Sequence, residues 1–139
     1  MNERPRPRVL LVEDDDNDVL FFQRALRDCG AEIELEIAGD GESALQRLSK
    51  EPRPDRVLLD LKLPRRSGLE VLAWIRSTPA LKDLSVTIMT SSGEPSDLSR
   101  IRELGIDQYI VKPVSYQGLF EIVVALCRTW NVPMSAAPH

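Results

Sequence analysis

RVLLDLKLPRRSG, residues 56–68, is the stretch that decides the fold. Its apolar residues Val57, Leu58 and Leu59 lead without polar interruption into Asp60, a pattern typical of a strand buried on both faces of a parallel sheet. A proline and a glycine follow within eight residues, so the chain is predicted to turn directly after this strand. Open α/β sheets bind ligands at the carboxyl edge of their strands, and Asp60 is therefore a candidate site residue. For Asp60 alone, a turn-forming or helix-capping role remains the alternative.

Five runs with strand patterns alternate with five segments of helical spacing along the chain. The expected strands are residues 8–12, 33–37, 57–59, 85–90 and 109–111, and the expected helices are 19–29, 44–48, 69–75, 98–104 and 119–126, the last extending toward Trp130. This alternation predicts a flavodoxin-like, doubly wound α/β fold: a five-stranded parallel sheet in the order 2-1-3-4-5 with five helices on its two faces. Alternating apolar and acidic residues place the second strand near an edge of the sheet.

With 139 residues the chain suits one domain, and we expect a flexible lead-in at 1–7, the domain at 8–130 and a C-terminal tail at 131–139. The composition, 42% hydrophobic and 29% charged, is that of a globular protein without a membrane helix or signal peptide, so a cytoplasmic location is expected. A net charge of −4 and the lack of a basic stripe argue against a nucleic-acid partner. Cys29 and Cys127 lack metal-ligand spacing and are expected to be reduced, buried thiols.

Carboxylates gather at the predicted carboxyl edge of the sheet. The first strand runs into Glu13 and Asp14, and the third runs into Asp60. Neighbouring carboxylates repel one another, so the site requires a cation, and an all-oxygen donor set favours Mg²⁺. A carboxylate beside Mg²⁺ is also a competent nucleophile for a phosphoryl group. Thr90 and Lys112, at the ends of the fourth and fifth strands, are suited to neutralise charge on the transferring group.

The acidic run continues past the first pair. Asp15, Asp16 and Asp18 are interpreted as turn and cap residues that compensate the dipole of the first helix, with Asp16 or Asn17 as its cap. None of them is expected to bind a metal ion.

Four short motifs, each closing a predicted strand, resemble those of the receiver domains of two-component response regulators, the chemotaxis regulators among them. They are LVED at 11–14, LLDLKLP at 58–64, MTS at 89–91 and YIVKP at 109–113, and the resemblance covers residues 8–126. It implies that Asp60 accepts a phosphoryl group from the phosphohistidine of a histidine kinase, within a phosphorelay. It also implies a signalling domain rather than an enzyme, with autodephosphorylation as its intrinsic reaction.

The resemblance implies a metal site in which Glu13, Asp14 and Asp60 hold Mg²⁺ together with the backbone carbonyl of Lys62. Lys62 and Ser92 lie two residues beyond Asp60 and beyond the fourth strand, over the expected mouth of the pocket. We expect these two residues to tune hydrolysis of the phosphoaspartate by shaping water access.

The resemblance also implies a switch. Thr90 is similar to the family's switch hydroxyl, and Tyr109 to the aromatic residue that moves inward on activation. Lys112 is similar to the lysine that pairs with the phosphoryl group, and the bond between Lys112 and Pro113 is expected to be cis. Activation would then be a population shift between two arrangements.

A narrower resemblance rests on three local features. Val114 stands where many receivers carry Phe, and DNDV at 16–19 and WNVP at 130–133 resemble the stand-alone regulators of phytochrome-type histidine kinases. The implied partner is such a sensor kinase or a phosphotransfer protein. The apolar terminus either folds back on its own domain or joins a homodimer built on the fourth helix, fifth strand and fifth helix.

Other functions on this fold remain open. A small-molecule phosphohydrolase with an aspartate nucleophile usually has a second Asp where this chain has Lys62. A flavin-binding electron carrier needs a phosphate loop where Glu13 and Asp14 would repel the phosphate. A third alternative is a receiver-like interaction module whose pocket does not accept a phosphoryl group. Only the complete set of site residues argues against it.

Overall fold

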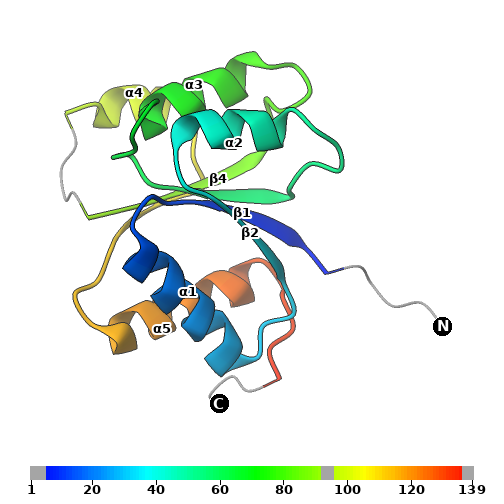
Figure 1. Cartoon of the computed structure of the whole chain (residues 1–139), viewed down its shortest axis with the longest axis vertical. Helices are drawn as coiled ribbons and strands as arrows, with labels where there is room; N and C mark the ends of the chain where they lie inside the picture. The colour runs from blue at the N-terminus through cyan, green and yellow to red at the C-terminus, as the bar shows by residue number, and fades with distance from the viewer. Residues whose placement is uncertain (1–5, 92–95, 136–139) are drawn as a thin grey trace.

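The computed structural model describes residues 6–91 and 96–135 (Figure 1). Within these residues, five parallel strands form one sheet in the order β2-β1-β3-β4-β5, which confirms the predicted fold. The strands are β1 (Arg8–Val12), β2 (Glu34–Ala38), β3 (Arg56–Leu59), β4 (Ser85–Thr90) and β5 (Gln108–Val111). The helices are α1 (Asp16–Cys29), α2 (Gly41–Leu48), α3 (Gly68–Ser77), α4 (Leu98–Leu104) and α5 (Tyr116–Thr129).

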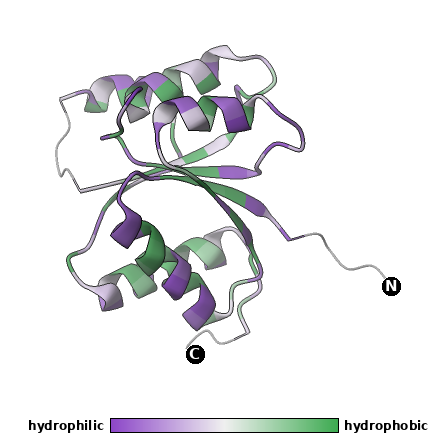
Figure 2. Cartoon of the chain, viewed as in Figure 1, coloured by the Kyte–Doolittle hydropathy of each residue, from purple (hydrophilic) through white to green (hydrophobic). Residues whose placement is uncertain are grey.

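Two helical layers enclose the sheet. Figure 1 shows α2, α3 and α4 over one face and α1 and α5 over the other. Hydrophobic residues follow the strands and the inward sides of the helices, and hydrophilic residues lie on the outer sides (Figure 2). Amphipathic helices that bury one stripe on each face of a parallel sheet are the arrangement that the sequence pattern requires.

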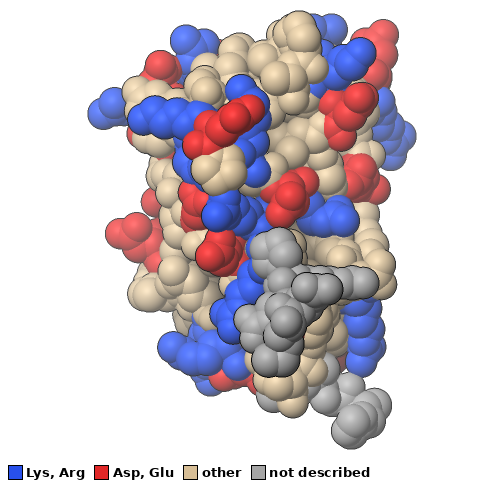
Figure 3. All heavy atoms as spheres, turned by 90° about the vertical axis from the view of Figure 1, so that its right-hand side faces the viewer, with Lys and Arg blue, Asp and Glu red and all other residues tan. Residues whose placement is uncertain are grey.

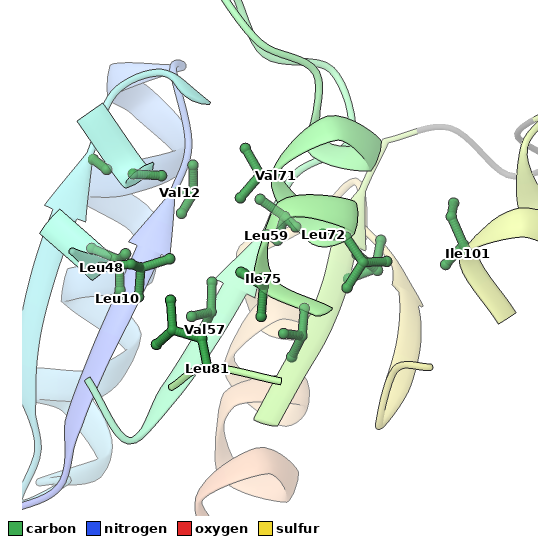
Figure 4. Packing of buried hydrophobic residues seen from close by; sticks show 14 residues of the cluster. Leu10, Val12, Leu48, Val57, Leu59, Val71, Leu72, Ile75, Leu81 and Ile101 are labelled. Carbon is green, nitrogen blue, oxygen red and sulfur yellow. The ribbon is translucent and has the colours of Figure 1, made fainter. Parts of the chain in front are cut away.

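Side chains of the central strands alternate between the two layers. In β1, Leu10 and Val12 pack toward α2 and α3, whereas Val9 and Leu11 pack toward α1 and α5. All four are buried. Figure 4 shows the buried cluster on the α2–α3 side of the sheet, where Leu48 of α2 and side chains of α3 pack against β1 and β3. This packing fixes the central strands and so the positions of the residues at their carboxyl ends.

Asp15, rather than Asp16 or Asn17, caps α1. Its carboxylate accepts hydrogen bonds from the backbone N–H groups of Asn17 (2.9 Å) and Asp18 (3.1 Å). Asp18 is therefore the third residue of the helix. Because helical side chains lean toward the helix N-terminus, Asp18 is directed back toward the edge of the sheet.

The segment after α5 folds back onto its own domain. The backbone N–H of Glu32 donates to the carbonyl of Pro133 (2.9 Å), and Val132 is buried beside α1 and α5. The guanidinium of Arg56 lies 5.3 Å from the ring centroid of Trp130. The terminus therefore packs on its own domain, as the first of the two alternatives expected, and the homodimer on the α4–β5–α5 face remains a prediction.

The described surface is of mixed charge. On the face that Figure 3 shows, basic and acidic side chains are interspersed. Arg8 pairs with Glu34, and Arg47 pairs with Glu36. No helix in residues 6–91 and 96–135 is both long and apolar enough to cross a bilayer.

Candidate functional site

The carboxyl ends of β1, β3 and β5 bring the predicted site residues together, at the left of Figure 1. Glu13 and Asp14 directly follow β1, and Asp60 directly follows β3. Val12 and Leu59 are register partners, and the backbone N–H of Asp60 donates to the carbonyl of Val12 at 3.1 Å. As a result, carboxylate oxygens of Glu13, Asp14 and Asp60 lie within 4.8 Å of one another.

Two of the three carboxylates are buried. The exposed fractions of Glu13 and Asp60 are 4% and 6%, while Asp14 is exposed. Burial raises the pKa of Glu13 to about 7, and the charge of Asp60 adds to this, against the lowering effect of a hydrogen bond from Lys112. Bringing these groups together without a neutralising charge is thus unfavourable, which is the electrostatic signature of a site for cations.

Lys112, which follows β5, supplies one positive charge. Its Nζ donates to Glu13 Oε1, to Asp18 Oδ2 at 2.8 Å and to Asp60 Oδ2 at 3.1 Å. Burial lowers the pKa of Lys112, but the hydrogen bonds that it donates to Asp18 and Glu13, together with the charge of Asp60, outweigh this, so the pKa is raised. The ammonium is therefore protonated at any physiological pH.

The expected cis bond between Lys112 and Pro113 is wrong. In the described residues the cis peptide bond is Glu51–Pro52, and Lys112–Pro113 is trans. The ammonium reaches the carboxylates all the same, because the backbone N–H of Lys112 donates to the carbonyl of Thr90 (2.8 Å) and holds the end of β5 against β4. The strand register, not a cis bond, places the lysine in this structure.

Thr90 ends β4 with a fully buried side chain. Its Oγ1 has no hydrogen-bond partner among the described residues. Tyr109 is partly buried on the α2–α4 side of the sheet. Its register partner is Ile88, two residues before Thr90, so Thr90 and Tyr109 belong to the same face of the sheet. Most buried hydroxyls have a partner, and the orphaned one marks Thr90 for a functional explanation.

Two cavities adjoin the site. One, of about 450 Å³, opens over the carboxylates and is lined by Asp60, Lys62, Ser91, Lys112 and residues 13–18. The other, of about 230 Å³, is an apolar cleft between α1 and the start of α5, floored by Leu11, Phe22, Met89 and Leu119 and rimmed by Phe21 and Val114. Glu13, Asp18 and Lys112 line both cavities, so they separate the acidic cavity from the apolar cleft.

The structure thus gathers Glu13, Asp14, Asp60 and Lys112 at one point. The backbone N–H of Lys62 donates to Asp60 Oδ1 at 3.1 Å, which places the Lys62 backbone beside them. Thr90 and Tyr109 lie on the neighbouring strands, and Ser92 lies outside the described residues.

Asp18 is the site residue that sequence reasoning missed. The signal for it is the position of the helix cap: with Asp15 as the cap, Asp18 falls where a helical side chain points back to the sheet edge.

The donor set fits a hard divalent cation. Glu13, Asp14 and Asp60 offer only oxygen ligands, with no His or Cys among them. Mg²⁺ and Mn²⁺ are bound by such sets, and Mg²⁺ keeps several waters while taking one or two carboxylates. An exposed Asp14 on the cavity wall leaves room for that hydration.

The family model for the response regulator receiver domain matches residues 9–124, and the chain belongs to this family of two-component signalling proteins. The resemblance found in the four motifs is thereby confirmed. Receiver domains are signalling domains that bind divalent metal ions and work with histidine kinases. Because the chain belongs to the receiver-domain family, the two alternative functions, a flavin-binding electron carrier and a small-molecule phosphohydrolase, have no support.

Among its relatives, the chain is 35% identical to the response regulator Rcp1 of Synechocystis sp. over 132 residues, which span 91% of this chain and 90% of Rcp1. The structure of the Mn²⁺-bound form of Rcp1 covers 89% of this chain and 94% of that one, with a TM-score of 0.81. The structure of the phosphorylated cyanobacterial phytochrome response regulator RcpA is 32% identical in sequence, with a TM-score of 0.83. It covers 94% of this chain and 99% of the RcpA chain. The narrower resemblance to phytochrome response regulators is therefore also confirmed.

Proposed function

We propose that this receiver domain accepts a phosphoryl group from a kinase phosphohistidine onto Asp60 in a Mg²⁺-dependent reaction, and signals in a phosphorelay through a protein-binding face. One observation carries the proposal. The buried Asp60 carboxylate has the Lys112 ammonium at 3.1 Å and the carboxylates of Glu13 and Asp14 within 4.8 Å. A nucleophile, a cation site and a fixed positive charge are thus assembled at one open cavity.

The transfer is a displacement at phosphorus. An oxygen of the Asp60 carboxylate forms the new P–O bond while the P–N bond of the phosphohistidine breaks. The electron pair of that bond stays on the ring nitrogen, and because the other ring nitrogen already carries a proton, histidine leaves as neutral imidazole. Lys112 lies where it can pair with a phosphoryl oxygen on Asp60 and offset its charge.

Glu13, Asp14 and Asp60 are the side chains that would hold the cation, with the carbonyl of Lys62 as a further ligand. Bound Mg²⁺ would neutralise charge on the phosphoryl group and on the carboxylates. The hydrogen bond from the Lys62 backbone to Asp60 supports this assignment, because it keeps that peptide at the site. The Lys62 side chain at the cavity wall also supports its role in tuning hydrolysis.

Intact mass measured after incubation with Mg²⁺ and acetyl phosphate tests the acceptor. The wild type should gain one phosphoryl group, and Asp60→Asn should gain none. Asp55→Asn is the matched control, because Asp55 lies at the opposite end of β3, where its carboxylate accepts from the backbone N–H of Arg8. A phosphoryl gain in Asp60→Asn would refute the acceptor, and equal gain with a chelator present would refute the metal dependence.

Thr90 and Tyr109 are proposed to carry the switch. The buried hydroxyl of Thr90 lacks a partner among the described residues, and an unsatisfied buried donor costs about 1–3 kcal/mol. A phosphoryl oxygen would relieve that cost and so favour an activated arrangement in which Tyr109 turns inward.

Backbone amide chemical shifts of β5, followed by NMR on adding a fluoroberyllate phosphoryl mimic, test the switch. They should move in the wild type and in Thr90→Ser but little in Thr90→Ala, because only the first two keep the hydroxyl. Full shifts in Thr90→Ala would remove Thr90 from the switch.

The proposed donor is a phytochrome-type histidine kinase or a phosphotransfer protein. Similarity to the phytochrome regulator RcpA supports this partner class. A homodimer on the α4–β5–α5 face is proposed as well, since Val111 of the edge strand β5 is 46% exposed. Light scattering with and without the phosphoryl mimic checks it, and monomers throughout at high micromolar concentration would contradict the dimer.

A further inference from the structure

Lys112 has a third partner that lies outside the candidate cation ligands. The ammonium has three N–H donors. Glu13 and Asp60 accept two of them, and both carboxylates belong to the group that a cation would share. The third acceptor is Asp18 of α1, at 2.8 Å, which is not a member of that group.

The position of Asp18 is fixed by its helix. Its backbone N–H is held by the cap residue Asp15 (3.1 Å), so the first turn of α1 is anchored where β1 ends. The Asp18 side chain is 41% exposed and that of Lys112 only 15%. Lys112 is the one cation that pairs with Asp18 among the described residues. The pair also forms the partition between the acidic cavity and the apolar cleft.

We propose that Asp18 is a positioning residue for phosphoryl transfer, which keeps the Lys112 ammonium over Asp60. This role rests on the proposed function. A cation held by Glu13 and Asp60 draws on the same oxygens that bind Lys112, and like charges repel each other. Asp18 is then the acceptor that still holds the ammonium. Without Asp18, the long and flexible lysine side chain is free to turn toward solvent.

The test compares the rates at which variants gain a phosphoryl group from acetyl phosphate. In this reaction the oxygen of Asp60 bonds to phosphorus while the P–O bond to acetate breaks, and acetate leaves with the electron pair. Asp18→Asn keeps the side-chain size and removes the charge. Asp16→Asn is the matched control, because Asp16 lies in the same helical turn, lines the same acidic cavity and is not a partner of Lys112.

Asp18→Asn should slow the phosphoryl gain about tenfold, the usual size of the effect when a supporting partner of a site residue is lost. Asp16→Asn should change the rate less than about twofold. Asp18→Glu, which restores the carboxylate, should recover most of the rate. In a Lys112→Ala background, Asp18→Asn should have less than about a twofold further effect, because it acts through the lysine.

Equal losses in Asp16→Asn and Asp18→Asn would show that charge near the cavity sets the rate, and would overturn the proposal. A full tenfold loss that persists in the Lys112→Ala background would overturn it as well. If the wild type is phosphorylated and Asp18→Asn gains the phosphoryl group at the same rate, the positioning role is refuted and the proposed function is not. A wild type that takes up no phosphoryl group refutes the proposed function and this role with it.

Unfolding by urea, without Mg²⁺ or donor, gives a readout that does not depend on transfer. The effect of Asp18→Asn on the unfolding equilibrium constant should differ about threefold between the wild-type and Lys112→Ala backgrounds, as for an ion pair with one partly exposed partner. No difference between the backgrounds would show that Asp18 does not hold Lys112.

Discussion

Gly68, the first residue of α3, lies so close to the backbone of Asp60 and Leu61 that no side chain fits there. A Cβ at this position would be 2.3 Å from the carbonyl oxygen of Asp60 and 2.6 Å from the Cα of Leu61. The backbone N–H of Gly68 also donates to the carbonyl of Leu61 (2.9 Å), so helix and loop are tied together. Gly68→Ala must therefore displace the peptide that carries Asp60.

The distances give the size of this displacement. Ordinary contact begins at 3.4 Å, so the 2.3 Å approach to the Asp60 oxygen requires a shift of about 1.1 Å. Overpacking of this kind costs about 1–3 kcal/mol, and the restricted unfolded chain of the alanine variant returns about 0.4–1 kcal/mol. We expect Gly68→Ala to lower the free energy of unfolding by about 1–2 kcal/mol. Because a misplacement of about 1 Å can slow a reaction about a hundredfold, phosphoryl gain should slow at least tenfold.

Urea unfolding followed by circular dichroism, and the time course of intact mass with acetyl phosphate, measure the two effects. Gly39→Ala is the matched control, since a Cβ there meets no atom within 4 Å. It should change the unfolding free energy by less than about 0.5 kcal/mol or stabilise the protein slightly. If Gly68→Ala is as stable as Gly39→Ala and gains the phosphoryl group as quickly, the close approach does not position Asp60.

Asp14→Ala should weaken Mn²⁺ binding about tenfold in isothermal titration, because one of the three clustered carboxylates is lost; equal affinity would remove Asp14 from the site. Burial raises the pKa of Cys127 to about 12, and Cys29 is equally buried, so neither thiol should react with a thiol reagent at pH 8 until the protein is unfolded; fast labelling of the native protein would contradict their burial. A hydrogen bond from Arg47 lowers the pKa of Glu36 below its ordinary 4.5, so the stabilisation by this pair is complete above that pH and is lost as the pH falls below it. Glu36→Gln should thus lower the unfolding free energy by about 0.5–1 kcal/mol at pH 7 and leave it unchanged near pH 2, as urea unfolding at the two pH values would show.

Residues that end a strand were the most predictable part of the site. Glu13, Asp60 and Lys112 each follow an apolar run, and parallel strands place their carboxyl ends at one edge whatever the details of helix packing. The topology alone therefore brings these side chains together. The bounds of β1 and β4 are those predicted, β3 and β5 begin one residue earlier, and the edge strand β2 lies one residue further along the chain than its alternating pattern indicated.

Positions that depend on helix phase and packing were not predictable. The acidic run offers several caps for α1, and moving the cap by one residue rotates every side chain by about 100° around the helix. The choice of Asp15 directs Asp18 to Lys112. In the same way, the sequence predicted that Cys29 and Cys127 are buried. It did not predict that the thiol of Cys29 in α1 lies within hydrogen-bonding reach of the thiol of Cys127 in α5.

The three ion pairs of Lys112 also bear on how the domain folds. They join residues 52, 94 and 99 positions apart in the chain. Closing such long loops is slow and entropically unfavourable, and the lysine arrives only with the last strand of the sheet. The acidic edge therefore gains its counter-charge only when β5 joins the sheet. A partly folded chain that ends before β5 would leave Glu13 and Asp60 without the lysine, so phosphoryl uptake should report completion of the whole sheet rather than of any part of it.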